Sequence, residues 1–238
     1  MSEPSIGEAT DARLGFYGKL PARGDFVTRR LPRSFVEPWD LWLQDSIANA
    51  AGALGDRWLD IYLEAPLWRF ITGPGICGNV AMAGVFMPSV DRVGRYFPLT
   101  LAAPLDGCRT PTSTVVAGTE WFERVETLAL TVLADDADFD TFDKASEEVT
   151  ALIAVPSRAG VSAFGVRRSY DAVHSVAVSA IEMNDAILLE AWPNWAIWWT
   201  AGSERVQPTM IMTRNLPPAS GFAAFLDGKW EEWGWATR

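Results

Sequence analysis

A charged loop enclosed between two apolar runs constrains the fold of this chain more than any other part of its sequence. Residues 80–87 form one continuous apolar run and residues 99–105 form a second, and the first is long enough for a buried strand. Pro88 ends the first run as a strand, because proline has no N–H to give to the sheet ladder. Gly94 lies in the loop, where the lack of a side chain permits a positive φ. The pattern predicts two core strands joined by a charged loop.

The seven residues after Pro88, residues 89–95, contain one hydroxyl and three charged side chains, those of Ser89, Asp91, Arg92 and Arg95. Two interpretations of this polarity remain open. In the first, Asp91 pairs with an arginine and braces the loop. In the second, the arginines face a binding partner, because a planar guanidinium makes several directed hydrogen bonds at an interface.

A second polar loop occurs near the beginning of the chain. Residues 14–20 predict a short strand, and the composition of residues 21–25 predicts a turn after it. Because ligand sites in α/β sheets gather at strand ends, we expect the 19–26 and 89–96 loops to lie side by side. An aspartate of one loop should then pair with an arginine of the other. The candidate binding residues are Lys19, Arg23, Asp25, Ser89, Asp91, Arg92 and Arg95.

The length and composition of the chain are typical of one globular domain. Its 238 residues are 49% hydrophobic, and 12 Trp and 12 Phe can fill much of a core. The net charge of −10 argues against a nucleic-acid partner, since such partners require a cationic surface. The charge is uneven, because residues 13–33 are basic and residues 120–148 are strongly acidic. This polarity suits protein partners, or two oppositely charged faces of one fold.

No part of the sequence indicates secretion, a membrane span or a disulfide framework. Residues 1–12 are polar and are expected to form a flexible N-terminal tail. Cys77 and Cys108 could pair, but two thiols make neither a disulfide framework nor a zinc site. The most lipid-like run, residues 191–201, is too short for a bilayer and is broken by Pro193. We therefore expect a cytoplasmic protein without direct membrane insertion.

A long amphipathic helix is predicted after the first loop. Ser34 and Glu37 have the spacing of a capping box, and Pro38 fits a first helical turn. Apolar residues then recur at helical spacing, and we expect this face to pack against the sheet. They are Trp39, Trp42, Leu43, Ile47, Ala50 and Leu54.

The rest of the chain predicts helices interspersed with strands. Two short helices are expected at residues 58–63 and 222–226. A third helix is expected to begin after a cap at Thr112 or Ser113, and a fourth is expected around Phe142. The third of these helices should bury Trp121, Val125, Leu128 and Val132, and the fourth Phe142, Ala145, Val149, Leu152 and Ile153. Strands are expected at residues 67–71, 161–166, 173–181, 187–191, 197–200 and 209–212, with a turn at Asn184-Asp185. An aromatic tail, Trp230, Trp233 and Trp235, should pack on the body. The expected fold is α/β, a single layered domain with a mixed β-sheet flanked by helices.

Motifs of catalysis are absent from the sequence. The single histidine, His174, lies in a predicted strand, where we expect it to be buried and hydrogen-bonded. No Gly-x-Ser-x-Gly elbow and no Rossmann glycine fingerprint occur. The acidic cluster at residues 135–140 lacks the glycine of an EF-hand loop. We expect no catalytic residue, no metal site and no cofactor, although acid–base pairs of Asp and Glu need no motif.

Two long motifs and one short stretch carry a family resemblance. The first motif comprises Gly15-Phe16-Tyr17-Gly18-Lys19-Leu20-Pro21, Gly24-Asp25-Phe26-Val27, Leu31-Pro32, Phe35-Val36 and Pro38-Trp39-Asp40-Leu41-Trp42-Leu43-Gln44. The second comprises Trp68-Arg69-Phe70 and Met87-Pro88-Ser89-Val90-Asp91-Arg92-Val93-Gly94-Arg95-Tyr96-Phe97-Pro98-Leu99. Together they resemble the TagF family of type VI secretion accessory proteins. Ile197-Trp198-Trp199-Thr200 resembles the family's Ser-x-Trp-Trp stretch, with Ala196 where serine is usual.

The resemblance covers residues 14–226 and implies a single TagF-like α/β domain over residues 13–238. It implies a non-enzymatic, post-translational repressor of type VI secretion that acts through protein contact. The forkhead-associated scaffold protein of that system is the expected partner. The alternative is a ligand- or nucleotide-sensing, or hydrolytic, α/β domain that uses Lys19, Asp25, Asp91, Arg92 and Arg95.

Overall fold

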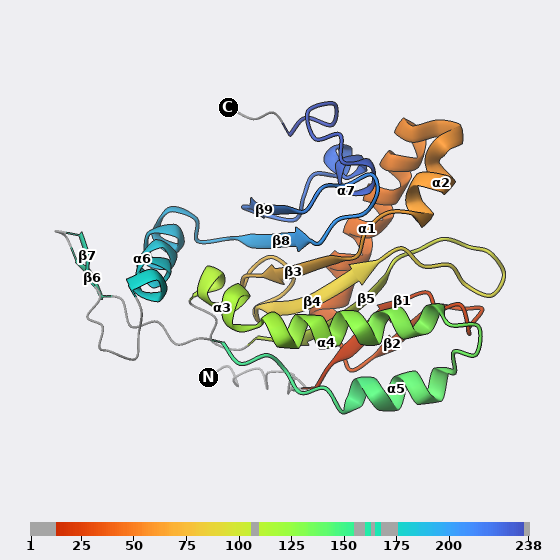
Figure 1. Ribbon diagram of the computed structural model, residues 1–238, viewed down its shortest axis with the longest axis horizontal. Coiled ribbons are helices and arrows are strands. Elements are labelled where there is room, and N and C mark those ends of the chain that lie inside the picture. Colours follow the sequence, from red (N-terminus) through yellow and green to blue (C-terminus); the bar gives the residue numbers. More distant parts are fainter. Residues whose placement is uncertain (1–12, 106–109, 155–159, 163–164, 168–175, 236–238) are drawn as a thin grey trace, which may run out of the picture.

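The two apolar runs form neighbouring strands at the centre of a seven-stranded sheet (Figure 1). The computed structural model describes residues 13–105, 110–154, 160–162, 165–167 and 176–235. The order across the sheet is β2-β1-β5-β4-β3-β8-β9. These strands are β1 (Gly15–Gly18), β2 (Val27–Arg29), β3 (Trp68–Thr72), β4 (Met82–Met87), β5 (Leu99–Pro104), β8 (Ala196–Thr200) and β9 (Thr209–Thr213). The α/β class is confirmed, but every neighbouring pair is antiparallel where a mixed sheet was expected.

Helices cover both faces of this sheet. The helix α1 lies behind the sheet in Figure 1, whereas α4 and α5 lie in front of it. The helices are α1 (Arg33–Leu54), α2 (Trp58–Leu63), α3 (Pro111–Ala117), α4 (Thr119–Leu130), α5 (Phe139–Glu147), α6 (Val176–Ala191) and α7 (Ala223–Asp227). Short 3₁₀ turns are η1 (Gly55–Arg57), η2 (Thr131–Leu133) and η3 (Ala219–Gly221), and β6 (Gly160–Ser162) pairs with β7 (Gly165–Arg167).

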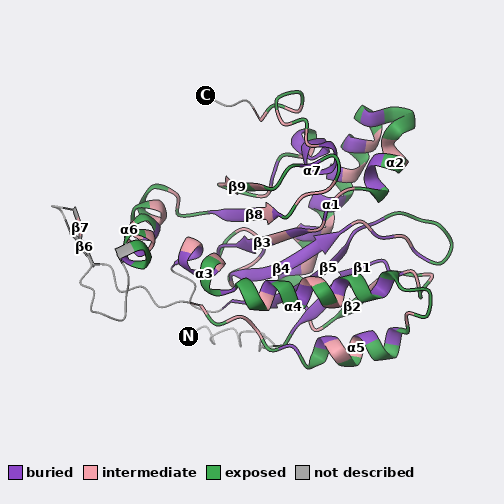
Figure 2. Ribbon diagram, viewed as in Figure 1, coloured by how far each residue is buried: buried purple, intermediate pink, exposed green. Residues whose placement is uncertain are grey.

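The central strands bury side chains on both faces, which explains why their sequences are continuously apolar. In β4, Phe86 faces the core shared with α1, while Val85 faces the core shared with α4. Figure 2 shows β4 and β5 buried along their whole length. Successive side chains of a strand point to opposite faces, so each central strand contributes to both cores.

The expected packing face of α1 is confirmed. Trp39 and Leu43 are fully buried and Trp42 is nearly so. The ring centroid of Trp39 lies 4.5 Å from that of Phe70 on β3 and 5.9 Å from that of Trp198 on β8. Its Nε1 donates a hydrogen bond of 2.9 Å to the hydroxyl of Thr100 on β5. An aromatic layer therefore attaches α1 to the middle of the sheet.

The start of α1 differs from the expectation. Pro32 occupies the N-cap position, and no side-chain cap bond is made there, so Ser34 is not the cap. Glu37 pairs with Arg33 on the neighbouring turn and does not form a capping box. Pro38 lies inside the helix, beyond the first turn. The core contacts of the following tryptophans outweigh the helix bond that proline cannot make.

The aromatic tail packs onto the body, as expected. Trp230, Trp233 and Trp235 contact the same core as α1 and α7. The Nε1 of Trp233 donates to the carboxylate of Asp227 at 3.0 Å, and the Nε1 of Trp235 donates to the carbonyl oxygen of Gly221 at 2.9 Å. The indoles of Trp233 and Trp235 thus find partners for their polar atoms while their rings are partly buried.

The strands expected within residues 173–191 are wrong for the described part of that range, because residues 176–191 form α6. Three buried polar residues, Ser179, Glu182 and Asp185, recur there at intervals of three. This is helical spacing, but its buried side is polar, so a search for apolar alternation cannot find it. The turn expected at Asn184-Asp185 is likewise inside the helix. Residues 168–175, including His174, lie outside the described residues.

Asp185 supplies the cap that was expected from Thr112 or Ser113. Its carboxylate accepts hydrogen bonds from the backbone N–H groups of Thr112 at 2.8 Å and Ser113 at 3.0 Å, and from both hydroxyls. These residues open α3, where N–H groups have no partner within the helix. The helix α3 ends at Ala117, and Gly118 separates it from α4, which buries Phe122, Val125 and Ala129. The expected Trp121 and Leu128 are only half-buried.

The helix expected around Phe142 is α5, which is shorter than its sequence pattern. Phe142 and Val149 are buried as expected, but Val149 lies beyond the end of the helix. Ile153 is 87% exposed, so the pattern fails there.

Neither cysteine is described as part of a disulfide. Cys77 is a free, buried thiol, and Cys108 lies outside the described residues. Burial raises the pKa of the Cys77 thiol to about 12, which keeps it protonated at neutral pH. Among the helices of the described ranges, none has the length and apolar character needed to cross a bilayer.

The packing of α1 predicts a large loss of stability when its core face is truncated. Trp42 is buried, and its Nε1 donates to the carbonyl oxygen of Pro217 at 2.8 Å. We expect Trp42→Ala to lower the free energy of unfolding by roughly 3–5 kcal/mol, measured by chemical denaturation. Leu41→Ala on the same helix is the control, because Leu41 is 63% exposed and should change stability little. Equal midpoints for wild type and Trp42→Ala would contradict this packing.

The Asp185 cap predicts a local effect on α3. We expect Asp185→Ala to accelerate amide hydrogen exchange at Thr112 and Ser113, because both N–H groups lose their acceptor. The increase should be at least about fivefold, as expected for the loss of a cap of about 1 kcal/mol or more. Asn184→Ala changes an exposed neighbour on α6 and should leave these amides protected. Unchanged protection in Asp185→Ala would show that another group caps α3.

Candidate functional site

The two polar loops lie side by side, as expected. The hydroxyl of Ser89 donates to the carbonyl oxygen of Lys19 at 2.7 Å, and the N–H of Arg92 donates to the carbonyl oxygen of Arg23 at 3.1 Å. Gly18, with φ of 131°, permits this contact, because a Cβ there would lie 2.1 Å from the carbonyl oxygen of Pro98. The glycine before Lys19 is therefore required by the close approach of the two backbones.

The carboxylate of Asp91 joins the two loops. One oxygen accepts from the N–H groups of Val93 at 3.0 Å and Arg95 at 2.9 Å. The other accepts from the ammonium of Lys19 at 2.9 Å and from the Nε of Arg95 at 2.7 Å. Lys19 and Asp91 are only 4% exposed, so this ion pair is buried. Desolvation alone would raise the pKa of Asp91, but these hydrogen bonds outweigh it and hold the pKa well below its usual range.

Tyr62 on α2 also holds the second loop, through Ser89. Its hydroxyl donates to the carbonyl oxygen of Ser89 at 3.1 Å and accepts from the N–H of the same residue at 3.0 Å. Burial raises the pKa of this phenol, although the hydrogen bond with Ser89 opposes that shift, so it remains a neutral donor. The sequence analysis missed Tyr62 as part of this cluster, because its helical spacing indicated only a core position.

The structure divides the seven candidate residues into two groups. Lys19, Ser89 and Asp91 are buried and bonded to one another or to the facing backbone, so they brace the loops. Four candidates lie on the outside, and we call them the two-loop surface: Arg23, Asp25, Arg92 and Arg95. The expected pairing between loops is present as an exposed contact of 3.7 Å between Arg95 and Asp25. Exposed contacts of this length contribute little to stability.

The members of the two-loop surface differ in how firmly they are held. The guanidinium of Arg95 is bonded to Asp91 and to the carbonyl oxygen of Gly24. Arg23 stacks its guanidinium 4.2 Å from the ring centroid of Phe139 and lies 3.8 Å from Asp140. Within the described part of the chain, the side chain of Arg92 makes no ion pair and no hydrogen bond. Arg92 is thus the candidate most available to another molecule.

A shallow depression of about 460 Å³ opens beside these residues. Three arginines and one aspartate line it, together with apolar and backbone groups; they are Arg23, Arg29, Arg92 and Asp25. Such a lining can bind an anionic side chain through the forked donors of arginine. No three His, Cys, Asp or Glu side chains of the described residues gather as metal ligands would. The arrangement can therefore recognise a charged group. The carboxylate whose pKa is strongly lowered, that of Asp91, is already bonded to Lys19 and Arg95.

The lowered pKa of Asp91 predicts that stability falls at acidic pH. Because the folded pKa lies below the ordinary value of about 3.9, the ionised carboxylate contributes its full stabilisation above about pH 4. That contribution is lost as the pH falls towards the folded pKa. We expect the urea midpoint of the wild type to fall more steeply between about pH 4 and pH 2 than that of Asp91→Asn.

Asp25→Asn is the control for this measurement. The side chain of Asp25 is fully exposed, so the variant should keep the wild-type steepness. Equal steepness in the wild type and Asp91→Asn would contradict a stabilising role for the buried carboxylate.

Comparisons with known proteins place this arrangement in a family. The model of the family described as TagF N-terminal domain, type VI secretion system-associated, matches residues 15–149, which include both loops. The crystal structure of PA0076 from Pseudomonas aeruginosa PAO1 superposes with a TM-score of 0.78 at 40% sequence identity. The match covers 91% of this chain and 94% of that one. No curated protein matches the sequence. The chain belongs to the TagF family of type VI secretion system-associated proteins.

Proposed function

We propose that this chain represses type VI secretion after translation, by binding a protein of the secretion system and without catalysing a reaction. The proposed partner is the forkhead-associated scaffold protein of that system. The proposal rests on membership of a type VI secretion-associated family. The two-loop surface is the proposed contact site. The buried ion pair of Lys19 and Asp91 fixes the loops there and leaves the side chain of Arg92 free to contact a partner.

The geometry supports a contact function for this surface. A binding surface gains affinity when the backbone that carries its exposed side chains is already fixed, because ordering a loop on binding costs free energy. The braced loops meet this need: the backbone N–H of Arg92 is bonded to Arg23, and Arg95 is anchored by Asp91. Arginine is also enriched among the residues that dominate interface energies.

The alternative of a hydrolytic or nucleotide-sensing domain has less support. It would use Lys19 and Asp91, but these two groups are buried and neutralise one another. A general base must reach the proton that it removes, and the carboxylate of Asp91 already accepts four hydrogen bonds. The remaining charged candidates, Asp25 among them, lie on open surface.

The acidic face of α4 and α5 is the second candidate for an interface. Part of that charge is already paired within the fold, since Glu126 binds Arg69 and Asp143 binds Arg30. This pairing favours the two-loop surface over the acidic face as the first site to test.

The proposal predicts that arginine variants separate binding from folding. We expect Arg92→Ala and Arg23→Ala to keep the wild-type melting temperature and to weaken scaffold binding by about tenfold or more. Cells overproducing either variant should secrete, whereas cells overproducing the wild type should not. Arg95→Ala should also lower the melting temperature, because it removes a hydrogen bond from Asp91. Arg33→Ala, an exposed arginine outside the loops, is the matched control.

Two outcomes would overturn the proposal. Folded Arg92→Ala and Arg23→Ala that bind and repress normally would remove the two-loop surface from the interface. Turnover of a nucleotide or phosphoprotein by the purified chain, lost in Asp25→Ala or Asp91→Ala, would instead establish the enzymatic alternative.

A further inference from the structure

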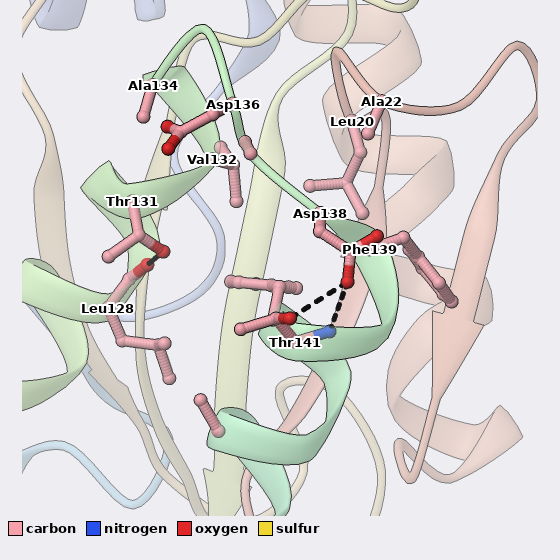
Figure 3. A pocket seen from close by; sticks show the side chains of 13 residues that line it. Leu20, Ala22, Leu128, Thr131, Val132, Ala134, Asp136, Asp138, Phe139 and Thr141 are labelled. Carbon is pink, nitrogen blue, oxygen red and sulfur yellow. Dashed lines mark hydrogen bonds between the residues drawn. The ribbon is translucent and has the colours of Figure 1, made fainter.

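An apolar pocket lies directly beside the two-loop surface. It encloses about 340 Å³ between the end of β1, the η2 turn and α5. Figure 3 shows Leu20, Leu128 and Val132 directed towards it from three different segments. Phe142 and Ala145 of α5 complete its wall. A pocket of this size and lining is at the lower limit of those that bind ligands, and suits one apolar side chain.

Four polar side chains also line the pocket, those of Thr131, Asp136, Asp138 and Thr141. Asp138 is occupied as the N-cap of α5, where its carboxylate accepts from the N–H and the hydroxyl of Thr141, each at 2.8 Å (Figure 3). The backbone hydrogen bond from Thr141 lowers the pKa of Asp138, so this carboxylate is ionised at neutral pH. An ionised rim beside an apolar interior favours an occupant that buries carbon and keeps its own charge elsewhere.

The apolar pocket and the arginine-lined depression adjoin one another. Ala22 and Phe139 line both. The guanidinium of Arg23 lies over the ring of Phe139, at the boundary between the two hollows. A ligand that spans this boundary would place an apolar group on one side of Phe139 and a charged group on the other.

The charges indicate the sign of that group. The chain carries a net charge of −10, yet the depression is lined by three arginines and one aspartate. Arg29 and Arg23 already lie near Asp143 and Asp140, at 3.4 and 3.8 Å. Among the arginines of this lining, Arg92 is the one that no described acid pairs with, and a single free positive charge suits a singly charged carboxylate better than a doubly charged phosphate.

We infer that these two adjoining hollows bind a protein segment in which an Asp or Glu stands close to a large apolar side chain. The apolar side chain fills the pocket formed by Leu20, Val132 and Phe142, and the carboxylate pairs with Arg92 and Arg23. This inference rests on the proposed function, because it defines the chemistry of the partner segment for the same surface. Charge complementarity favours this occupant over a basic or an uncharged segment.

The test is a selection of random dodecapeptides displayed on phage against the immobilised full chain. We expect the enriched peptides to carry Asp or Glu within about four residues of Leu, Ile, Met, Phe or Trp, the reach of neighbouring side chains on an extended strand or a helical turn. One enriched peptide is then synthesised with a fluorescent label. Its amide form, with Asp or Glu replaced by Asn or Gln, and its form with the apolar residue replaced by Ala should each bind at least about tenfold more weakly.

Variants of the chain test the two hollows separately. Ala145→Leu fills the apolar pocket without changing charge, and Arg92→Glu reverses one charge of the depression. Each variant should lower the affinity for the labelled peptide by about tenfold or more. The control Arg33→Glu changes an exposed arginine outside the loops and should alter this affinity by less than about twofold. Ala137→Leu fills the same pocket from its rim and replaces Ala145→Leu if that variant does not fold.

The inference is overturned if no peptide is enriched, or if the enriched peptides lack an acid. It is also overturned if folded Ala145→Leu and Arg92→Glu bind the peptide like the wild type, or if phosphoserine in place of the acid binds more tightly. Failure of the proposed function is distinguishable, because a wild-type chain that does not repress secretion overturns that function whatever the peptides show. Normal repression by folded Ala145→Leu, together with loss of repression in Arg92→Ala, would overturn the inference alone.

Discussion

The carboxylate of Asp91 is the group on which the arrangement of the site depends. It lies in a loop between two core strands and receives donors from its own loop and from Lys19, a residue 72 positions earlier. A buried carboxylate without such donors would be strongly destabilising, so the two loops are obliged to meet. The same contact orients the neighbouring side chains, because the backbone that carries Arg92 and Arg95 is fixed by bonds to Asp91 and Arg23.

This bracing explains why an acidic chain has an arginine-rich surface at one place. The basic beginning of the sequence lies against the acidic α5, with Arg13 bonded to Glu147 and Arg30 to Asp143. The uneven charge is therefore partly paired within the fold, which differs from both interpretations left open from the sequence, protein partners or two oppositely charged faces. Arg92 lies on the second loop, away from these acids in the sequence, and no described acid pairs with it. The free positive charge of Arg92 therefore depends on where the fold puts this loop and not on the overall composition of the chain.

The parts predicted from sequence are those whose physics is local or strongly periodic. The apolar runs of β4 and β5, the aromatic face of α1 and the position of β8 all followed from spacing, because burial on one or both faces leaves a regular pattern. The juxtaposition of the two loops also followed, since both come directly after strands of one sheet. The sequence could not predict which candidates brace the loops and which face outward, because Ser89 and Arg92 are both polar residues of the same loop. Their burial depends on the backbone of the other loop and on Tyr62.

The main error in the sequence analysis has the same physical origin as the main feature of the site. The helix α6 was expected as strands because its Val and Ile residues suggested alternation, while its buried side consists of Ser179, Glu182 and Asp185. Asp185 is buried because it caps α3, with donors 73 positions earlier at Thr112, much as Asp91 is buried because it meets Lys19. A prediction from hydrophobic periodicity assumes that buried positions are apolar. Two buried carboxylates of this chain, those of Asp91 and Asp185, break that assumption because each bonds a donor far away in the sequence. A buried acid is visible in a sequence only when its partner is near, so an irregular acid between apolar runs is best treated as a sign of a long-range contact.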